Sequence, residues 1–366
     1  MEAAADKEHY HLAVIEMLTN VRDSHSFAFS KVLDEHFGAA STAVRVRWIE
    51  GAPVVTAVGK ATDDSKADIQ PGDVIVSVDG EDASTRVQRL VRYMPASTPQ
   101  SLCRRVCARL LDGSEGSPAT VVVRKPSGQS TEVKLVCHAS FNSDPQRTGD
   151  ILRVLPGGIG YADLDRLPVA MVDEMFQKFK DAPAIIFDMR GYPQGTAWSI
   201  APRLTEQKGP TAARFSQPLV LEPIGAVDEV SSSTYTFLQS IPQTTQPRYK
   251  GKTVMLIDDR TISQAEHTGL FFEAANGTKF VGSPTTGANG DVTQFMVPGG
   301  IRIWMTGHDV RHADGRQLQR VGLQPDVPAA PTIDGIRPGR DEVLERALEY
   351  LGQKGPFQLG GVGEAR

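Results

Sequence analysis

The chain has 366 residues, of which 40% are apolar, 23% charged and 7% aromatic, and this composition predicts a globular protein of two or three domains rather than a disordered chain. Asp and Glu number 44 against 39 Lys and Arg, giving a formal net charge of −5, which argues against nucleic acid as a partner in a chain without a basic block. No apolar run is long enough to span a membrane. The first residues show no signal-peptide pattern, so the cellular location stays open.

The first part of the chain, residues 1–42, is predicted to be a helical segment. Apolar residues recur at helical spacing over 9–21, and a second short helix is expected over 30–37. The polar loop Asp23-Ser24-His25-Ser26 lies between them.

A β-rich block follows over residues 43–138. Apolar residues alternate with arginines over 44–48, which predicts a strand. Further strands are expected over 54–58, 74–78, 120–124 and 131–136, and helices over 84–93 and 102–111.

The segment IQPGDVIVSVDG at residues 69–80, followed by this order of elements, resembles a PDZ domain. The resemblance implies that a peptide or protein substrate is bound by its C-terminus through strand addition. Residues 43–48 are the candidate binding edge. The alternative is a PDZ-like spacer that binds nothing.

Strands and helices alternate over the third part, residues 139–352. Near-continuous apolar strands are expected over 184–188, 253–257 and 278–282, a pattern typical of a parallel sheet covered on both faces. The order predicts a layered α/β core. Other expected elements are a strand over 160–164, a helix over 169–179, a long loop over 214–250, a C-terminal helix over 341–351 and a flexible tail over 353–366.

An apolar strand ends at Ile257, a polar turn follows, and a helix is predicted to begin near Ser263. A hydroxyl at this position can act as a nucleophile, because free N–H groups at the helix start can hold the oxyanion that forms. The alternative is that Ser263 only caps the helix, with Glu266 completing a capping box.

Several other segments also bear on the role of Ser263. Taken together and in this order, five parts of the chain resemble the S41 peptidase family. They are the loop with His25, the PDZ-like block, the loop Asp188–Gly195, the turn 283–288 and the segment Gly322–Val327. That family includes the C-terminal processing proteases, the tricorn core protease and the interphotoreceptor retinoid-binding modules. The resemblance implies a layered crotonase/ClpP-like α/β core with an inserted PDZ-like β-rich domain. It also implies a serine endopeptidase with Ser263 as the nucleophile.

The processing proteases pair their serine with a lysine, which the turn 286–290 lacks. The tricorn-like branch uses a histidine from a D-x-H loop, and His25 matches it, so the resemblance implies His25 as the general base. Gln319 stands where that branch has a supporting glutamate, and its neutral amide can orient an imidazole but stabilises imidazolium less. Glu266 or Asp23 is an alternative acid. His267, four residues after Ser263, is a rival base whose alternative is a structural role.

The N–H of Gln264 is one candidate oxyanion donor. The resemblance implies a second donor from the glycines after Asp188-Met189-Arg190, here Gly191 or Gly195, whose alternative role is turn geometry. Arg190 is expected to brace its loop through Asp188 or a carbonyl rather than to touch substrate. No metal and no cofactor are expected.

Two other functions remain open. One is a non-proteolytic binding module for an apolar ligand or a peptide, and the other is an esterase or amidase that acts on small substrates with the same serine. The sequence leaves the oligomeric state open.

Overall fold

The computed structural model describes residues 6–59, 68–141, 147–219, 233–355 and 357. The chain divides into two compact units. Unit 1 comprises Met1–Asp150, Gln294–Trp304 and Pro328–Arg366, and unit 2 comprises Ile151–Thr293 and Met305–Val327. Most of the tail expected over 353–366 lies outside the described residues. Within the described ranges, no helix has both the length and the apolar character needed to cross a membrane.

Unit 1 begins with the two helices that the sequence predicts, α1 (Lys7–Thr19) and α2 (Lys31–Phe37). Asp6 and Ser30 cap their N-termini with side-chain hydrogen bonds. Between the helices, β1 (Phe27–Phe29) pairs with β16 (Ile301–Thr306), which neighbours β15 (Val292–Val297). Val14 and Leu18 of α1 pack against Ile301 and Ile303 of β16.

The β-rich part of unit 1 is a sheet in the order β2-β3-β4-β6-β7, with β5 beside β4. Its elements are β2 (Val44–Ile49), β3 (Ala52–Val58), β4 (Val74–Val78), β5 (Glu81–Asp82), α3 (Ala83–Val91), α4 (Pro99–Arg109), β6 (Pro118–Arg124) and β7 (Ser130–Val136). The strand expected as a binding edge, β2, does lie at the edge of this sheet, and α4 packs beside it. The helix α9 (Glu342–Tyr350) confirms the C-terminal helix that the sequence predicts.

The core of unit 2 is a six-stranded sheet in the order β18-β14-β13-β10-β9-β8. Its strands are β8 (Leu152–Leu155), β9 (Ile159–Asp163), β10 (Ala184–Asp188), β13 (Lys252–Ile257), β14 (Lys279–Gly282) and β18 (Val327–Pro328). From β9 to β14 the neighbouring strands are parallel. Because β10 carries only buried residues, helices must cover both faces. The expected α/β core is therefore confirmed.

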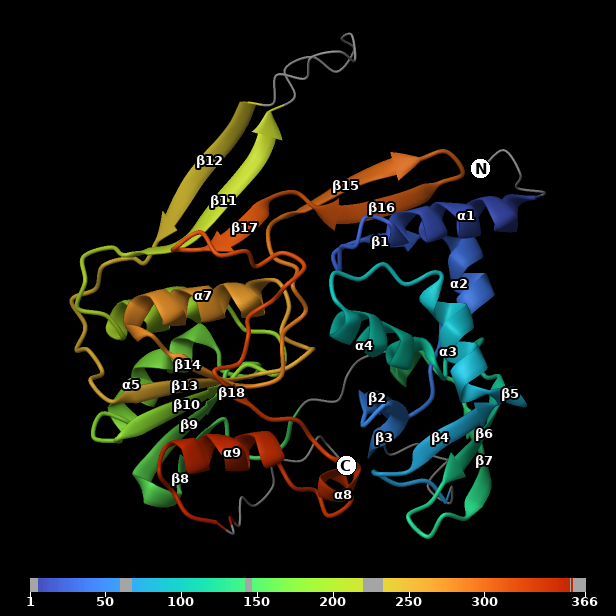
Figure 1. Cartoon of the computed structure of the whole chain (residues 1–366), viewed down its shortest axis with the longest axis horizontal. Helices are drawn as coiled ribbons and strands as arrows, with labels where there is room; N and C mark the ends of the chain where they lie inside the picture. Colours follow the sequence, from blue (N-terminus) through green and yellow to red (C-terminus); the bar gives the residue numbers. More distant parts are fainter. Residues whose placement is uncertain (1–5, 60–67, 142–146, 220–232, 356, 358–366) are drawn as a thin grey trace. The chain divides into compact units, whose positions relative to one another are not determined.

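Helix α7 (Gln264–Asn276) lies on one face of the six-stranded sheet (Figure 1). Phe272 of α7 packs against Phe187 of β10, with ring centroids 4.8 Å apart. The short helices α5 (Val172–Lys178) and α6 (Ala197–Ile200) also belong to this unit. Because β13 leads directly to α7, this packing sets the position of the turn between them, residues 258–263, relative to the sheet.

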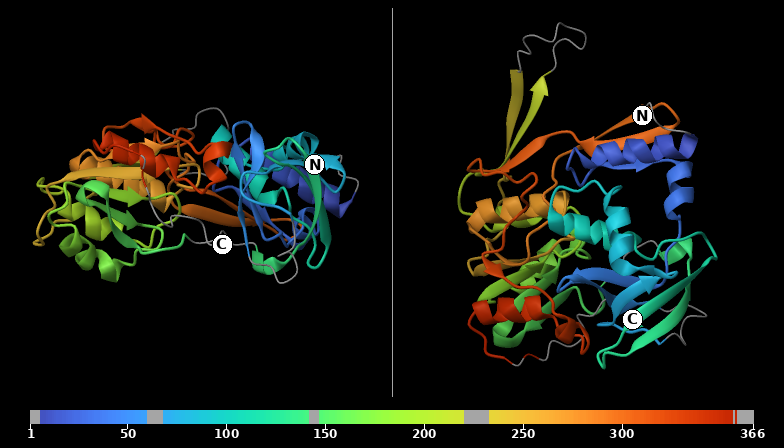
Figure 2. Two further views of the ribbon diagram at one scale, coloured as in Figure 1. Left: turned by 90° about the horizontal axis from the view of Figure 1, so that it is seen from below. Right: turned by 45° about the vertical axis from the view of Figure 1, so that its right-hand side comes forward.

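The prediction of a long loop over 214–250 is wrong for 214–219 and 233–240, while residues 220–232 lie outside the described ranges. Residues Thr211–Leu219 (β11) and Ser233–Ser240 (β12) form an antiparallel pair, and β11 also pairs with β17 (Asp309–His312). The right-hand view of Figure 2 shows β11 and β12 as paired strands that extend beyond the core of their unit. Phe215 and Phe237 stack across the pair, with ring centroids 4.7 Å apart, and such cross-strand aromatic contacts stabilise a pair rich in Ser and Thr.

Candidate active site

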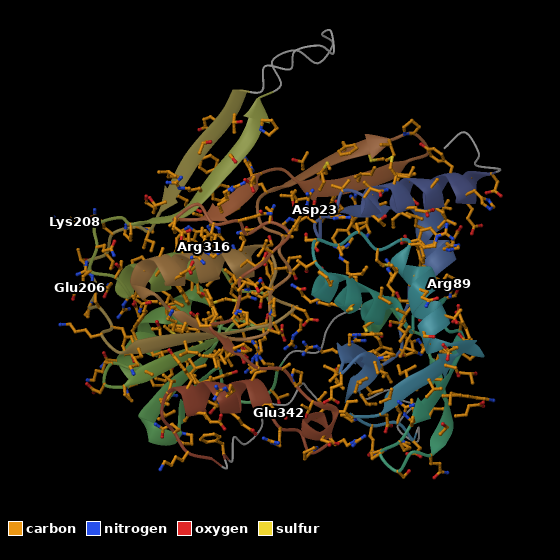
Figure 3. The ribbon with its side chains drawn as sticks, viewed as in Figure 1. Asp23, Arg89, Glu206, Lys208, Arg316 and Glu342 are labelled. Atoms are coloured by element: carbon orange, nitrogen blue, oxygen red, sulfur yellow. The ribbon has the colours of Figure 1, made fainter. Side chains whose placement is uncertain are left out.

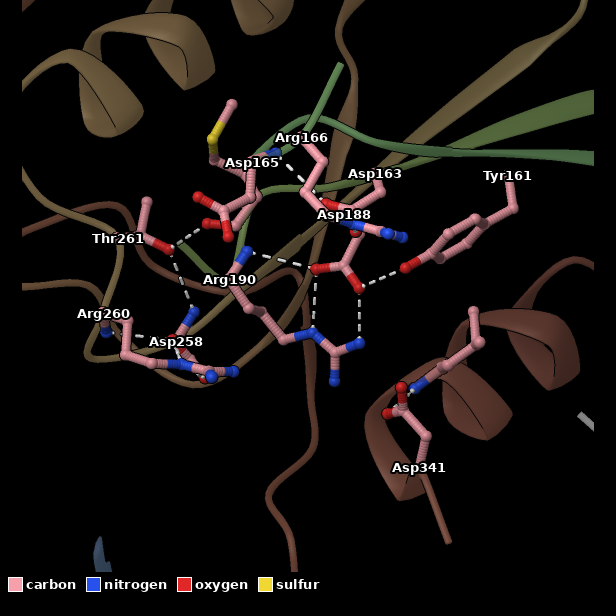
Figure 4. Close-up of polar contacts among 12 residues, drawn as sticks. Tyr161, Asp163, Asp165, Arg166, Asp188, Arg190, Asp258, Arg260, Thr261 and Asp341 are labelled. Carbon is pink, nitrogen blue, oxygen red and sulfur yellow. Dashed lines mark hydrogen bonds and ion pairs between the residues drawn. The ribbon is translucent and has the colours of Figure 1, made fainter. Parts of the chain in front are cut away.

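Two neighbouring parallel strands of unit 2, β9 and β10, end on aspartates, and an aspartate directly follows the next strand, β13, so these carboxylates meet at one edge of the sheet. Each aspartate pairs with an arginine two or three residues later, as Figure 4 shows. The pairs are Asp163 with Arg166, Asp188 with Arg190, and Asp258 with Arg260, at 2.7, 2.6 and 2.9 Å. Tyr161 also donates to Asp188 over 2.8 Å. These pairs fix the start of each loop, and the expectation that Arg190 braces its loop through Asp188 is confirmed.

Ser263 stands in the turn between β13 and α7 with φ 56° and ψ −120°, a conformation that favours glycine and strains any other residue. Its side chain makes no capping hydrogen bond to the helix, so the alternative of a simple capping serine is wrong. Its N–H donates to the carbonyl oxygen of Ala288 over 2.8 Å. The hydroxyl is partly exposed at the start of the helix.

Only the glutamate half of the expected capping box is present, because the N–H of Ser263 acts on the carboxylate of Glu266 while the Ser263 side chain does not cap the helix. The fully buried carboxylate of Glu266 also accepts hydrogen bonds from the N–H groups of Gly287 and Ala288, at 2.7 and 2.9 Å, and from the hydroxyl of Thr285. Burial raises the pKa of Glu266 to about 7, against the opposing effect of these hydrogen bonds. Both carboxylate oxygens are thus engaged by the loop after β14, which they hold against α7.

Gln264 is the first residue of α7 and is partly exposed. Among the described residues, no hydrogen bond to its backbone N–H is found, as is usual in the first turn of a helix. This N–H adjoins Ser263 in the chain and is available for an oxyanion.

The two glycines proposed as the second donor differ in their surroundings. A Cβ on Gly191 would meet the carboxyl carbon of Asp165 at 2.6 Å, so this glycine is required by close approach. Asp165 also accepts from the N–H of Tyr192 over 2.9 Å. Gly195 has φ 75° and open space around it. Sequence reasoning did not single out Asp165, and its only signal was a polar residue soon after a strand.

Gln319 is fixed by hydrogen bonds to backbone. Its Oε1 accepts from the N–H of Asn289 over 2.8 Å, while its Nε2 donates to the carbonyl oxygens of Asn289 and His308, at 2.7 and 3.3 Å. The amide thus joins the segment 317–319 to the loop after Ala288. A carboxylate here would have no proton to donate to these two carbonyls.

His267 is buried among aromatic rings. Its ring centroid lies 5.8 Å from that of Trp198, 5.7 Å from Phe215 and 5.0 Å from Phe271. Burial lowers the pKa of His267 to about 4, so the ring is neutral at pH 7. This packing favours the structural role over that of a rival base.

His25 belongs to unit 1, in the loop between α1 and β1, close to Asp23, which Figure 3 labels. Its N–H donates to Oδ1 of Asp23 over 3.0 Å, and the hydroxyl of Ser26 donates to Oδ2 over 3.2 Å. Burial lowers the pKa of His25 below its usual value, Asp23 opposes this effect and Arg105 adds to it. The imidazole is therefore held neutral at pH 7, the form in which a base accepts a proton.

Six of the seven predicted site residues share unit 2, namely Ser263, Gln264, His267, Gln319, Gly191 and Gly195. His25 belongs to unit 1, so its pairing with Ser263 remains a prediction. Among the described residues, no group of three or more His, Cys, Asp or Glu side chains is suited to hold a metal ion.

Comparisons with known proteins point to one class. Residues 158–329 match the model of peptidase family S41. The matched part of the chain contains Ser263 and the parallel strands from β9 to β14. No curated protein matches the chain by sequence.

Solved structures share the fold over nearly the whole chain. Mature CPAF complexed with lactacystin is 14% identical, with a TM-score of 0.67 over 94% of this chain and 87% of that one. The photosystem II D1 C-terminal processing protease is 17% identical, with a TM-score of 0.51 over 96% and 88%. A putative peptidase from Parabacteroides merdae is 16% identical, with a TM-score of 0.52 over 96% and 84%. Together with the family match, these similarities support a serine-type peptidase with a proteolytic role.

Proposed function

We propose that the chain is a serine endopeptidase that hydrolyses peptide bonds through an acyl-enzyme on Ser263. The observation that carries the proposal is the strained turn at Ser263, with φ 56° and a hydroxyl not used for capping. A serine held in this way presents its oxygen beside the first N–H of a helix, as in other nucleophile turns.

In the proposed reaction, His25 accepts the hydroxyl proton while Ser263 Oγ bonds to the peptide carbonyl carbon. The N–H of Gln264 stabilises the oxyanion, and Gly195 is favoured as the second donor because the carboxylate of Asp165 lies against Gly191. The C–N bond then breaks and the imidazolium gives its proton to the leaving amine. A water molecule, deprotonated by His25, hydrolyses the ester and restores the serine.

The experiment is labelling with a fluorophosphonate, together with cleavage of casein. Ser263→Ala should abolish both. Ser283→Ala, which alters a serine just after β14, is the matched control and should keep both. Labelling of the Ser263 variant at the wild-type rate would remove this serine from the mechanism.

The role of His25 has its own test. His25→Ala should slow labelling by about 10²–10⁴-fold, the usual contribution of a general base. Added imidazole should restore part of the rate, because a small base can enter the space that the ring leaves. Full activity of His25→Ala would refute the proposed base.

We also propose that the edge of β2 beside α4 captures the C-terminus of the substrate. The position of β2 at the sheet edge supports strand addition. Peptides ending in a free carboxylate should bind more tightly than the same peptides with an amidated end, as measured by fluorescence anisotropy. Equal affinity would contradict carboxylate capture.

A further inference from the structure

Arg105 of α4 contacts the loop that carries His25. Its Nη1 donates to the carbonyl oxygens of Ser26 and Pro95, at 3.1 and 2.6 Å, and its Nη2 donates to the carbonyl oxygen of Ser24. The guanidinium carbon also lies 4.2 Å from the centre of the Phe27 ring. One side chain from the β-rich block thus holds three carbonyls and one ring of unit 1.

These bonds act on the backbone on both sides of His25. The peptide group between Ser24 and His25 is held at both ends, because Arg105 binds its carbonyl and Asp23 accepts from its N–H over 3.0 Å. A peptide group is planar, so two such contacts set its orientation. The carbonyl of Ser26 fixes the next turn of the chain.

The hydroxyl of Ser24 fastens the same loop to the start of α4. It contacts the hydroxyl of Ser101 over 2.7 Å and accepts from the N–H of Ser97 over 2.8 Å. The loop is therefore docked on α4 by hydroxyl and guanidinium contacts together.

We propose that Arg105 is a positioning residue for His25, which sets the orientation of the imidazole by holding the carbonyls of Ser24 and Ser26. The inference rests on the proposed function, in which His25 is the base. The donors of Arg105 bind backbone carbonyls, and its charge interacts with that of Asp23 in the same loop.

The chemistry of the side chain explains why an arginine is needed. A guanidinium has a rigid planar fork that can bind several carbonyls and lie over an aromatic ring at once, whereas an ammonium is a point charge. Burial lowers the pKa of Arg105 to about 10, so it stays charged at pH 7. The charged groups that act on the imidazole are Asp23, which raises the pKa of His25, and Arg105, which lowers it.

The test compares Arg105→Lys with Arg105→Gln by the rate of fluorophosphonate labelling across pH. Both variants should label about 10–100-fold more slowly, since small misplacements of a catalytic group have effects of this size. Only Arg105→Gln should move the acid limb of the profile to higher pH, because loss of the positive charge raises the pKa of His25. A purely structural role would lower the amount of active protein without moving the limb.

Arg109→Gln is the matched control on the same helix, since Arg109 lies over the Phe37 ring at 5.4 Å and pairs with Asp112 at 3.6 Å. It should keep the wild-type rate. If circular dichroism shows that the Arg105 variants do not fold, Phe27→Leu tests the positioning role instead. Phe27 is 40% exposed, so the variant should fold, and loss of the ring removes one contact that holds the guanidinium. This variant should label about threefold more slowly, which corresponds to a modest cation–π contribution.

Folded Arg105 variants with the wild-type rate and acid limb would overturn the proposal, as would an unchanged rate in Phe27→Leu if only that variant folds. His25→Ala, measured in parallel, separates the two levels. Wild-type labelling of His25→Ala would refute the proposed function itself. Loss of labelling in His25→Ala with normal Arg105 variants would refute only the positioning role.

Discussion

The backbone N–H of Ser263 donates to the carbonyl oxygen of Ala288 over 2.8 Å. This bond ties the turn before α7 to the loop after β14, and Glu266 binds the same loop from the first turn of the helix. Two contacts from one helix end thus hold Ser263 at its positive φ. A strained residue persists only where its surroundings fix it in this way.

The backbone strain at Ser263 predicts that two substitutions of this residue differ in their effect on the free energy of unfolding. Ser263→Gly should raise the free energy of unfolding by about 1–2 kcal/mol, because glycine adopts this backbone conformation without a Cβ clash. Ser263→Ala should change it little, since the Cβ remains. Urea denaturation of both inactive variants measures the difference. An equal gain in the two variants would show that the backbone at this position is not strained.

Glu266 predicts a loss of stability as the pH rises. Its pKa is about 7 in the folded protein against about 4.5 when exposed, so the folded state binds this proton more tightly. The resulting stabilisation is fully present below about pH 4.5 and is lost as the pH rises through 7, in total about 3 kcal/mol.

Glu266→Gln is the comparator, because its side chain does not titrate. The difference in unfolding free energy between wild type and variant, measured in urea at several pH values, should shift by this amount between pH 4.5 and 8 in favour of the variant. A constant difference would contradict the raised pKa.

For His267 we expect the opposite pH dependence, in which the free energy of unfolding falls as the pH drops. Its pKa is about 4 in the folded protein against an ordinary 6.5, so the unfolded chain takes up the proton first. Stability from the neutral ring is present above about pH 6.5 and falls by about 3 kcal/mol as the pH drops to 4. His267→Phe should keep the aromatic packing and flatten this acid loss. Thermal unfolding from pH 4 to 7 gives the comparison, and parallel curves would contradict the prediction.

Gln319→Glu should destabilise the protein rather than restore a missing acid. The new carboxylate would face the carbonyl oxygens of Asn289 and His308, to which Nε2 of Gln319 now donates. We expect a loss of about 1–3 kcal/mol at pH 8, smaller at pH 5, where the carboxyl can be protonated. Melting temperatures at the two pH values test this. Gln207→Glu, at an exposed position in the same unit, is the control.

The sequence predicted the parts of the fold that local patterns determine. Strand β10 reads as a continuous apolar run because both of its faces are buried. The pair β11 and β12 was missed because its Ser, Thr, Gln and Pro residues are typical of loops. Its strand character depends on pairing between distant segments, including β17.

The site shows the same division between local and distant contacts. The strand, turn and helix around Ser263 could be predicted, but its positive φ could not. For Glu266 the sequence offered Ser263 as a partner, and the N–H of Ser263 does act on its carboxylate, but its other partners lie about twenty residues further on. The role of Arg105 could not be predicted from the sequence, because the carbonyl groups that it binds belong to residues about eighty positions earlier and reach it only in the folded chain.

The aspartate–arginine pairs at the strand ends have a consequence for engineering. Each pair is contained in one short loop, such as Asp188 with Arg190 or Asp258 with Arg260. A loop of this kind carries its own counter-ion, so it can be exchanged between homologous scaffolds as a cassette without stranding a buried charge. Transplanting only one member of a pair would leave the other charge without its counter-ion.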